Sequence, residues 1–181
     1  MLVAQALVLQ FIERLIPNPI PVPGIKLGLA NIVTLFSLVV FDFKATLSII
    51  LLRVVLGSLL LGTFLGAGLF MSLAGAVAAG CIMAILLRFL PDISLIGVSI
   101  AGSVAHCTGQ LIIAALLINH SGIFYYLPIM LLLSVPTGFV TGLFSTKVIK
   151  YFKSNNIMGS SLLRFDMKQK SVNRSSHNSL Y

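Results

Sequence analysis

The chain is organised around residues 16–34, which read IPNPIPVPGIKLGLANIVT. Prolines alternate with other residues through the first half of this stretch. We expect that half to be extended and stiff, because proline lacks an amide donor and biases the preceding residue away from the helical region. An apolar helix is predicted to begin immediately afterwards. It would carry Lys26 at its mouth and Asn31 one to two turns inside, where a cation and an amide have no obvious structural purpose.

Composition assigns the chain to the integral membrane proteins. Hydrophobic residues make up 58% of the 181 residues, charged residues make up 9%, and the mean hydropathy is +1.08. A soluble domain carries roughly 25% charged residues. Open sheets are unfavourable in lipid, since each unsatisfied backbone group there costs several kcal/mol. We therefore predict an all-α fold, a compact bundle of about six transmembrane helices.

Six apolar spans follow from the positions of charges, glycines and prolines. The first ends in Glu13 and Arg14 and is short, at roughly 22 Å against a hydrocarbon core of roughly 30 Å. Asp42 and Lys44 form a tight turn between the second and third spans, and Pro136 is expected to kink the sixth. Small residues three or four apart in the fourth span predict close helix packing. The spans cover approximately residues 1–15, 25–41, 45–61, 70–90, 95–118 and 124–149.

The C-terminal residues differ in composition from the rest of the chain. We divide the chain into a six-helix transmembrane domain, residues 1–152, and a disordered, basic cytoplasmic tail, residues 153–181. The positive-inside rule then places both termini in the cytoplasm and the protein in the plasma membrane as a multi-pass protein, with Lys44 and Arg88 on the same side. The net charge of +8 is interpreted as topology and attraction to anionic lipid, with no nucleic acid as partner.

The same topology predicts that Glu13, Arg14 and Lys26 lie on the outer side of the membrane. Two cations there run against the orientation rule, so we consider Glu13 and Arg14 a possible outer gate and Lys26 a substrate-binding candidate. The proline-rich segment between them would fold over the outer mouth as a lid. The alternative is an interfacial salt bridge, with Lys26 snorkelling to the headgroups.

Arg53 is the strongest single signal, because it lies near the middle of the third span. A central arginine costs roughly 2.5 to 3.5 kcal/mol on insertion scales, so it must face protein or water. We expect no acidic residue within a span to be deep enough to neutralise it. Its partner would then be amides such as Asn31 and Gln110, or an anion from outside. The alternative is a purely structural hydrogen-bond clamp with Asn31.

A polar stripe is predicted on the fifth span. Ser103, His106 and Gln110 are spaced by three and four residues, and therefore share one helical face. This stripe, Arg53 and Asn31 can meet only in the interior of the bundle. We interpret the five residues as candidates for a positively charged pocket that binds a small anionic or strongly hydrogen-bonding ligand.

Three motifs carry a family resemblance. They are GIKLGLANIVTL at residues 24–35, LRVVLGS at residues 52–58 and SVAHCTGQ at residues 103–110. Over about residues 8–149 the chain resembles heptaprenyl diphosphate synthase component I, also called the Gx transporter family. That family is similar to the substrate-binding S components of energy-coupling factor (ECF) transporters, which are small six-helix proteins.

This resemblance implies a capture subunit whose ligand enters from outside. A separate transmembrane coupling protein and ATPase subunits would power transport. Small residues on the first helix of an S component normally meet the coupling protein. Here Ala4 and Ala6 are present without an Ala-x-x-x-Ala pair.

The residues argue against catalysis by this chain itself. Prenyl chain elongation needs magnesium held by clustered aspartates. No phosphate-binding loop with Lys and Ser/Thr is present, and His106 has Ser103 one turn away but no carboxylate to orient it. We predict no metal site and no cofactor, and interpret Cys81 and Cys107 as buried hydrophobes. The four acidic residues are isolated from one another: Glu13, Asp42, Asp92 and Asp166.

Two hypotheses for function remain. The first is an S-component-like subunit that captures a small anionic or amphipathic solute. The second is the noncatalytic membrane subunit, component I, of heptaprenyl diphosphate synthase in isoprenoid or menaquinone side-chain synthesis, with a soluble catalytic subunit as partner. The first predicts dependence on Lys26 and Arg53. The second predicts dependence on the turn at residues 42–44 and on the basic tail.

Overall fold

Six α-helices form the bundle in the part of the chain that the structure describes, as predicted. The structure is a computed structural model, and it describes residues 2–15, 29–90, 93–119 and 121–154. Lys26, the proline-rich segment and the tail beyond Ser154 lie outside the described residues. The helices are α1 (Leu2–Leu15), α2 (Asn31–Val40), α3 (Phe43–Leu60), α4 (Ala67–Phe89), α5 (Leu95–Ile118) and α6 (Leu127–Ser154), with the 3-10 helix η1 (Ser121–Tyr126) before α6.

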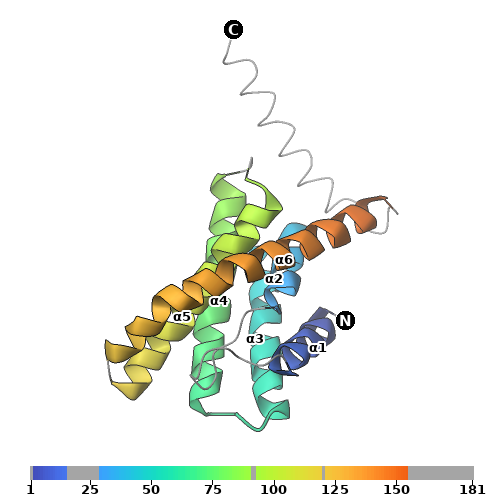
Figure 1. Cartoon of the computed structure of the whole chain (residues 1–181). Helices are drawn as coiled ribbons and strands as arrows, with labels where there is room; N and C mark the ends of the chain where they lie inside the picture. Colours follow the sequence, from blue (N-terminus) through green and yellow to red (C-terminus); the bar gives the residue numbers. More distant parts are fainter. Residues whose placement is uncertain (1, 16–28, 91–92, 120, 155–181) are drawn as a thin grey trace.

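Within the described residues, four segments are long and apolar enough to cross a membrane. They are α3, α4, α5 and the segment Gly122–Phe152, which covers most of η1 and of α6. Helix α6 runs along α5 and also packs on α2 (Figure 1). Helices α1 and α2 are shorter, with 14 and 10 residues, which correspond to about 21 Å and about 15 Å. The prediction of a six-helix membrane bundle is therefore confirmed, with two helices too short to cross the hydrocarbon core alone.

The start of the second helix differs from the sequence expectation. Leu29 and Ala30 form a turn, and α2 begins at Asn31. Asn31 is therefore the first residue of α2, so the expectation that it lies one to two turns inside the helix is wrong, while residues 25–28 lie outside the described residues. Asparagine favours helix ends because its side chain competes with the backbone for hydrogen bonds. The side-chain amide of Asn31 therefore lies at the N-terminal end of α2, next to α3.

Small residues bring α4, α5 and α6 close together. A Cβ added to Gly109 of α5 would lie 3.0 Å from the carbonyl oxygen of Ala74 in α4, and one added to Gly138 of α6 would lie 2.6 Å from Cα of Ile100 in α5. Backbones that approach this closely compensate for the lack of a hydrophobic driving force between helices in lipid. The predicted small-residue face of α4 is confirmed, since its members are buried: Ser72, Gly75, Ala76, Ala79 and Gly80.

One end of the bundle gathers basic residues. Leu2 of α1 and Phe152 of α6 both pack against an apolar cluster formed by Phe36, Val39, Val40 and Ile149, so the first turn of α1 and the last turn of α6 lie at the same end. Beside it are the α2–α3 turn and the last turn of α4. We call this region the basic end, after its four described cations: Lys44, Arg88, Lys147 and Lys150.

Candidate functional site

Arg53 lies in the interior of the bundle, in the middle of α3. Its side chain is only 3% exposed. Its Nη2 donates a hydrogen bond to Oδ1 of Asn31 over 3.5 Å, which is longer than a typical N–H···O bond of about 2.7–3.2 Å and makes the bond weak. Asn31 is also buried. The structure thus brings together two residues, 22 positions apart in the chain, that the sequence selected as candidates.

Glu13 is the unexpected neighbour of Arg53. The side chain of Glu13 is 7% exposed, and it lines a cavity together with Arg53. Its carboxylate interacts electrostatically with the guanidinium. The expectation that no acidic residue lies deep enough to neutralise Arg53 is therefore wrong. Helix α1 packs on α3, so a residue near the end of a short apolar run is carried into the interior.

The outer gate of Glu13 and Arg14 stays a prediction. Glu13 faces the interior of the bundle. Arg14 belongs to α1, but its side chain, like the whole of Lys26, lies outside the described part of the chain.

The three residues of the predicted polar stripe, Ser103, His106 and Gln110, are buried, but they face two different helices. His106 lines the cavity beside Arg53. His106 and Gln110 both contact α4 at Gly75, where an added Cβ would lie 2.7 Å from Cγ of Gln110 and 3.1 Å from Cε1 of His106. Ser103 points instead towards α6, with its Oγ 3.1 Å from the position of a Cβ on Gly138. His106 is therefore the member of the stripe that joins Arg53.

The cavity beside Arg53 is small. Its volume is about 10 Å³, which is room for about one water molecule. Among the described atoms, Nε of Arg53 and Nδ2 of Asn31 are buried without a hydrogen-bond partner. A water molecule there would satisfy such groups. We call the polar side chains that line this cavity, together with Asn31, which accepts the hydrogen bond from Arg53, the interior polar cluster: Gln10, Glu13, Asn31, Arg53, Ser72 and His106.

Two members of the interior polar cluster were missed by the sequence analysis. Gln10 of α1 is buried and packs on α3 at Gly57, where an added Cβ would lie 2.5 Å from its Nε2. Ser72 of α4 was considered only as a small packing residue. A signal for Gln10 is present in the sequence, because Ala6, Gln10 and Glu13 share one face of α1 at spacings of four and three, and all three are buried.

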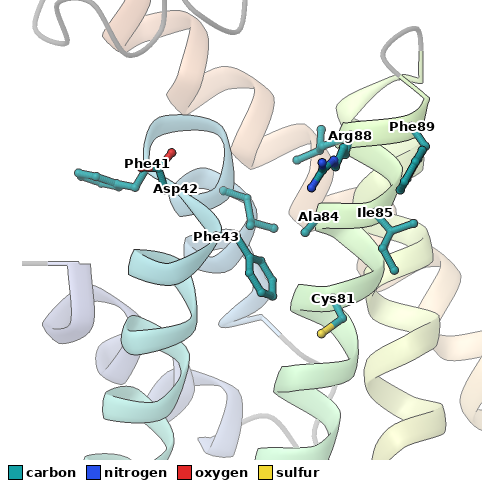
Figure 2. A pocket seen from close by; sticks show the side chains of 10 residues that line it. Phe41, Asp42, Phe43, Cys81, Ala84, Ile85, Arg88 and Phe89 are labelled. Carbon is teal, nitrogen blue, oxygen red and sulfur yellow. The ribbon is translucent and has the colours of Figure 1, made fainter.

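A second, larger space opens at the basic end. It is a cleft of about 700 Å³ between the α2–α3 turn and the C-terminal half of α4, and this volume is in the range of small-molecule sites. Most of its lining is apolar. Asp42 stands on the wall formed by the turn and Arg88 on the wall formed by α4, while Phe43 projects towards the space between them (Figure 2). The half-buried thiol of Cys81 also lines it.

Arg88 is available to a ligand in this cleft. Its side chain is exposed, and its guanidinium carbon lies 6.0 Å from the ring centroid of Phe89, a cation–π distance. Because Arg88 lies in the last turn of α4, its positive charge also interacts favourably with the helix dipole. Arg88 and Asp42 are the charged residues among those that line the cleft, and Lys44 directly follows Phe43 in the chain without lining it.

Neither space resembles a metal centre. Within the described ranges, no three His, Cys, Asp or Glu side chains gather as they would around one metal ion. The chemistry offered is ion pairing and hydrogen bonding in the interior, and apolar contact with cationic groups in the cleft.

The fold and these two sites define a multi-pass helical membrane protein with charged groups inside the bundle. The chain belongs to the heptaprenyl diphosphate synthase component I family, whose sequence model matches residues 2–148. This match includes both the interior polar cluster and the cleft, and it confirms the resemblance seen in the motifs. No curated protein and no solved structure gave a significant match.

Proposed function

We propose that this protein is the noncatalytic membrane subunit of a heptaprenyl diphosphate synthase, which serves isoprenoid or menaquinone side-chain synthesis. In this role it binds the amphipathic prenyl diphosphate and holds the soluble catalytic subunit at the membrane. The observation that carries the proposal is the cleft at the basic end, of about 700 Å³. The family description supports it, because a first component implies a further one.

The lining of the cleft suits a ligand with an apolar chain and an anionic head. Phe41, Phe43 and Ile85 offer apolar surface to an isoprenoid chain, and burial of such surface contributes roughly 25 cal/mol per Å². Arg88 offers a planar guanidinium, which can bind phosphate oxygens through two parallel hydrogen bonds. Lys44 adds a second cation nearby.

The position of the cleft suits exchange with a soluble partner. Since cytoplasmic loops carry an excess of Lys and Arg, we infer that the basic end faces the cytoplasm. The cleft then lies where the membrane meets the compartment of the catalytic subunit. A product released by that subunit would reach the bilayer through a site that accepts both its head and its chain.

Catalysis is assigned to the partner. Of the four acidic residues, Glu13 lies in the interior polar cluster and Asp42 in the cleft, so they belong to different sites. Prenyl elongation depends on several aspartates around magnesium. The described carboxylates are therefore not arranged for that chemistry.

Co-purification from native membranes tests this proposal. The tagged protein should bring down an aspartate-rich prenyl diphosphate synthase, and Asp42→Ala or Arg88→Ala should reduce its recovery or its load of prenyl diphosphate. Lys147→Ala is the matched control, because Lys147 is a basic residue of α6 that does not line the cleft. Recovery of ATPase subunits in place of a synthase would contradict the proposal.

A second candidate function rests on the interior polar cluster. A buried arginine in a membrane protein commonly marks a ligand or ion pathway. The protein would then be the substrate-binding subunit of an ECF-type transporter, with a coupling protein and ATPase subunits as partners. Its solute would be small and anionic or amphipathic, such as an isoprenoid precursor or a quinone-related or flavin-like molecule. Because the cavity holds about one water molecule, the bundle would have to open to admit it.

The packing of α1 bears on how a coupling protein would dock in this second case. Ala6 is fully buried in the bundle, whereas Ala4 is exposed. A small-residue contact with a coupling protein would therefore involve Ala4 and not Ala6. Uptake that depends on Arg53 but not on Arg88 would favour this candidate over the synthase subunit.

A further inference from the structure

The residue that balances the charge of Arg53, Glu13, belongs to the short helix α1 and not to one of the four long apolar segments. Arg53 is buried in α3, and it donates a hydrogen bond to the neutral amide of Asn31. An amide accepts a hydrogen bond but does not compensate a charge. Of the described side chains that line the cavity, Glu13 of α1 is the one that carries negative charge.

We infer that the cavity beside Arg53 is an anion site closed by the protein itself, in which the carboxylate of Glu13 takes the place of a small free carboxylate. Glu13 and Arg53 line the same cavity of about 10 Å³, and both side chains are more than nine-tenths buried. The Nε donor of Arg53 and the Nδ2 donor of Asn31 remain buried without partners among the described atoms. They are the groups that would bind an oxygen-rich anion.

Helix α1 supplies the group that closes the site. Its bundle-facing side is formed by Ala6, Gln10 and Glu13. On its flank an open groove of about 270 Å³ runs between α1 and the C-terminal part of α3. A shift of α1 along this groove would remove the carboxylate from Arg53, and an incoming anion would compensate the charge.

This inference concerns a different site from the synthase cleft, since the linings share no residue. Its test is chemical rescue. Glu13→Ala removes the carboxylate and leaves room beside Arg53. Thermal unfolding of the purified membrane protein in detergent is followed by circular dichroism, in sodium formate and in sodium gluconate at equal ionic strength. Formate is the probe for a small carboxylate, and gluconate is too large for the space.

The expected result is a lower unfolding midpoint for Glu13→Ala and a saturable rise with formate. At about ten times the dissociation constant, formate would multiply the folding equilibrium constant about elevenfold. The wild type should show no such rise. Gln10→Ala is the matched control, because Gln10 lines the same cavity and its loss makes space without removing charge. Glu13→Ala/Arg53→Met should lose the response to formate, because the cation is gone.

Three results would overturn the inference: a Glu13→Ala variant as stable as the wild type, an equal response to formate in the wild type, or a response that persists without Arg53. If Glu13→Ala cannot be recovered as a folded protein, recovery of the folded double variant Glu13→Ala/Arg53→Met tests the inference instead. Its recovery supports the inference, because removal of both charges relieves the imbalance. Its failure to fold counts against the inference.

Discussion

Arg53 donates from its Nη2 to Oδ1 of Asn31 over 3.5 Å and so joins the middle of α3 to the first residue of α2. The bond connects a cation to a neutral group, and Glu13 supplies the opposite charge from a third helix. The interior of the bundle therefore depends on the relative placement of α1, α2 and α3.

The role of Arg53 can be resolved by separating binding from stability. If a captured anion is its partner, Arg53→Ala should weaken binding of that anion by more than about 2 kcal/mol, because a charged hydrogen bond is lost. Binding is measured by calorimetry with the compound that mass spectrometry identifies in the purified protein. A clamp between helices predicts unchanged binding and reduced resistance to SDS-induced unfolding.

A carboxylate on α2 should be able to replace the carboxylate of Glu13 on α1. Glu13→Gln leaves the buried guanidinium uncompensated and should destabilise the protein by about 3–5 kcal/mol. Adding Asn31→Asp places a carboxylate at the position that already accepts the hydrogen bond from Arg53, and it should restore most of this loss. SDS titration of the two variants measures the difference. Equal stability of the single and double variants would show that the charge of Glu13 is not what Arg53 requires.

Arg88 should control affinity for prenyl diphosphates. Arg88→Ala removes a charged hydrogen bond to the diphosphate, worth about 1.5–3 kcal/mol, or roughly a ten- to hundredfold change in dissociation constant. Farnesyl diphosphate binding to the purified protein in nanodiscs provides the measurement. Lys147→Ala should bind as the wild type does. Comparable losses in both variants would indicate general attraction to the basic end.

Cys81 offers a direct report on occupancy of the cleft. Its half-buried thiol lines the cleft, whereas Cys107 is buried in an apolar cluster. Farnesyl diphosphate should slow the reaction of Cys81 with N-ethylmaleimide several-fold, because the bound chain covers the thiol. Mass spectrometry of the labelled peptides distinguishes the two cysteines. The protection should disappear in Arg88→Ala, and identical labelling with and without ligand would place the binding elsewhere.

Gly138 should be intolerant of a side chain. An added Cβ would lie 2.6 Å from Cα of Ile100, so Gly138→Ala forces α5 and α6 apart and should destabilise the bundle by about 1–3 kcal/mol. Gly68→Ala is the control, since its added Cβ would lie 4.0 Å from Cβ of Thr63, an ordinary van der Waals distance. That substitution should be neutral or stabilising by up to about 1 kcal/mol, because alanine has the higher helix propensity. SDS-induced unfolding compares both variants with the wild type.

Much of the fold was predictable because it depends on local features. Helix α5 begins and ends as expected: Ser94 caps its start by accepting a hydrogen bond from the Gly97 amide, and Asn119 ends it in the left-handed conformation. The long apolar runs identified the spanning helices, since lipid requires every backbone group to be satisfied within the segment. The burial of Arg53, His106 and Gln110 followed from their place in such runs.

The candidate site was predictable only in part. Arg53 and Asn31 do meet, but Ser103 faces α6, Gln10 was missed, and Glu13 was not expected to lie deep enough to neutralise Arg53. The cleft at the basic end was not predicted from the sequence, although the turn at residues 42–44, which forms one of its walls, was singled out. Each of these features depends on which helices lie side by side.

By itself, the sequence determined that this chain crosses a membrane as helices and that several polar side chains lie inside the bundle. Composition and apolar run length suffice for this, because the bilayer imposes the same requirement on every segment. Only the tertiary structure decided that Glu13 and Arg53 line one cavity and that a ligand-sized cleft opens beside Arg88. The reason is that a short helix such as α1 gains its depth from the helices it packs against and not from its own hydropathy.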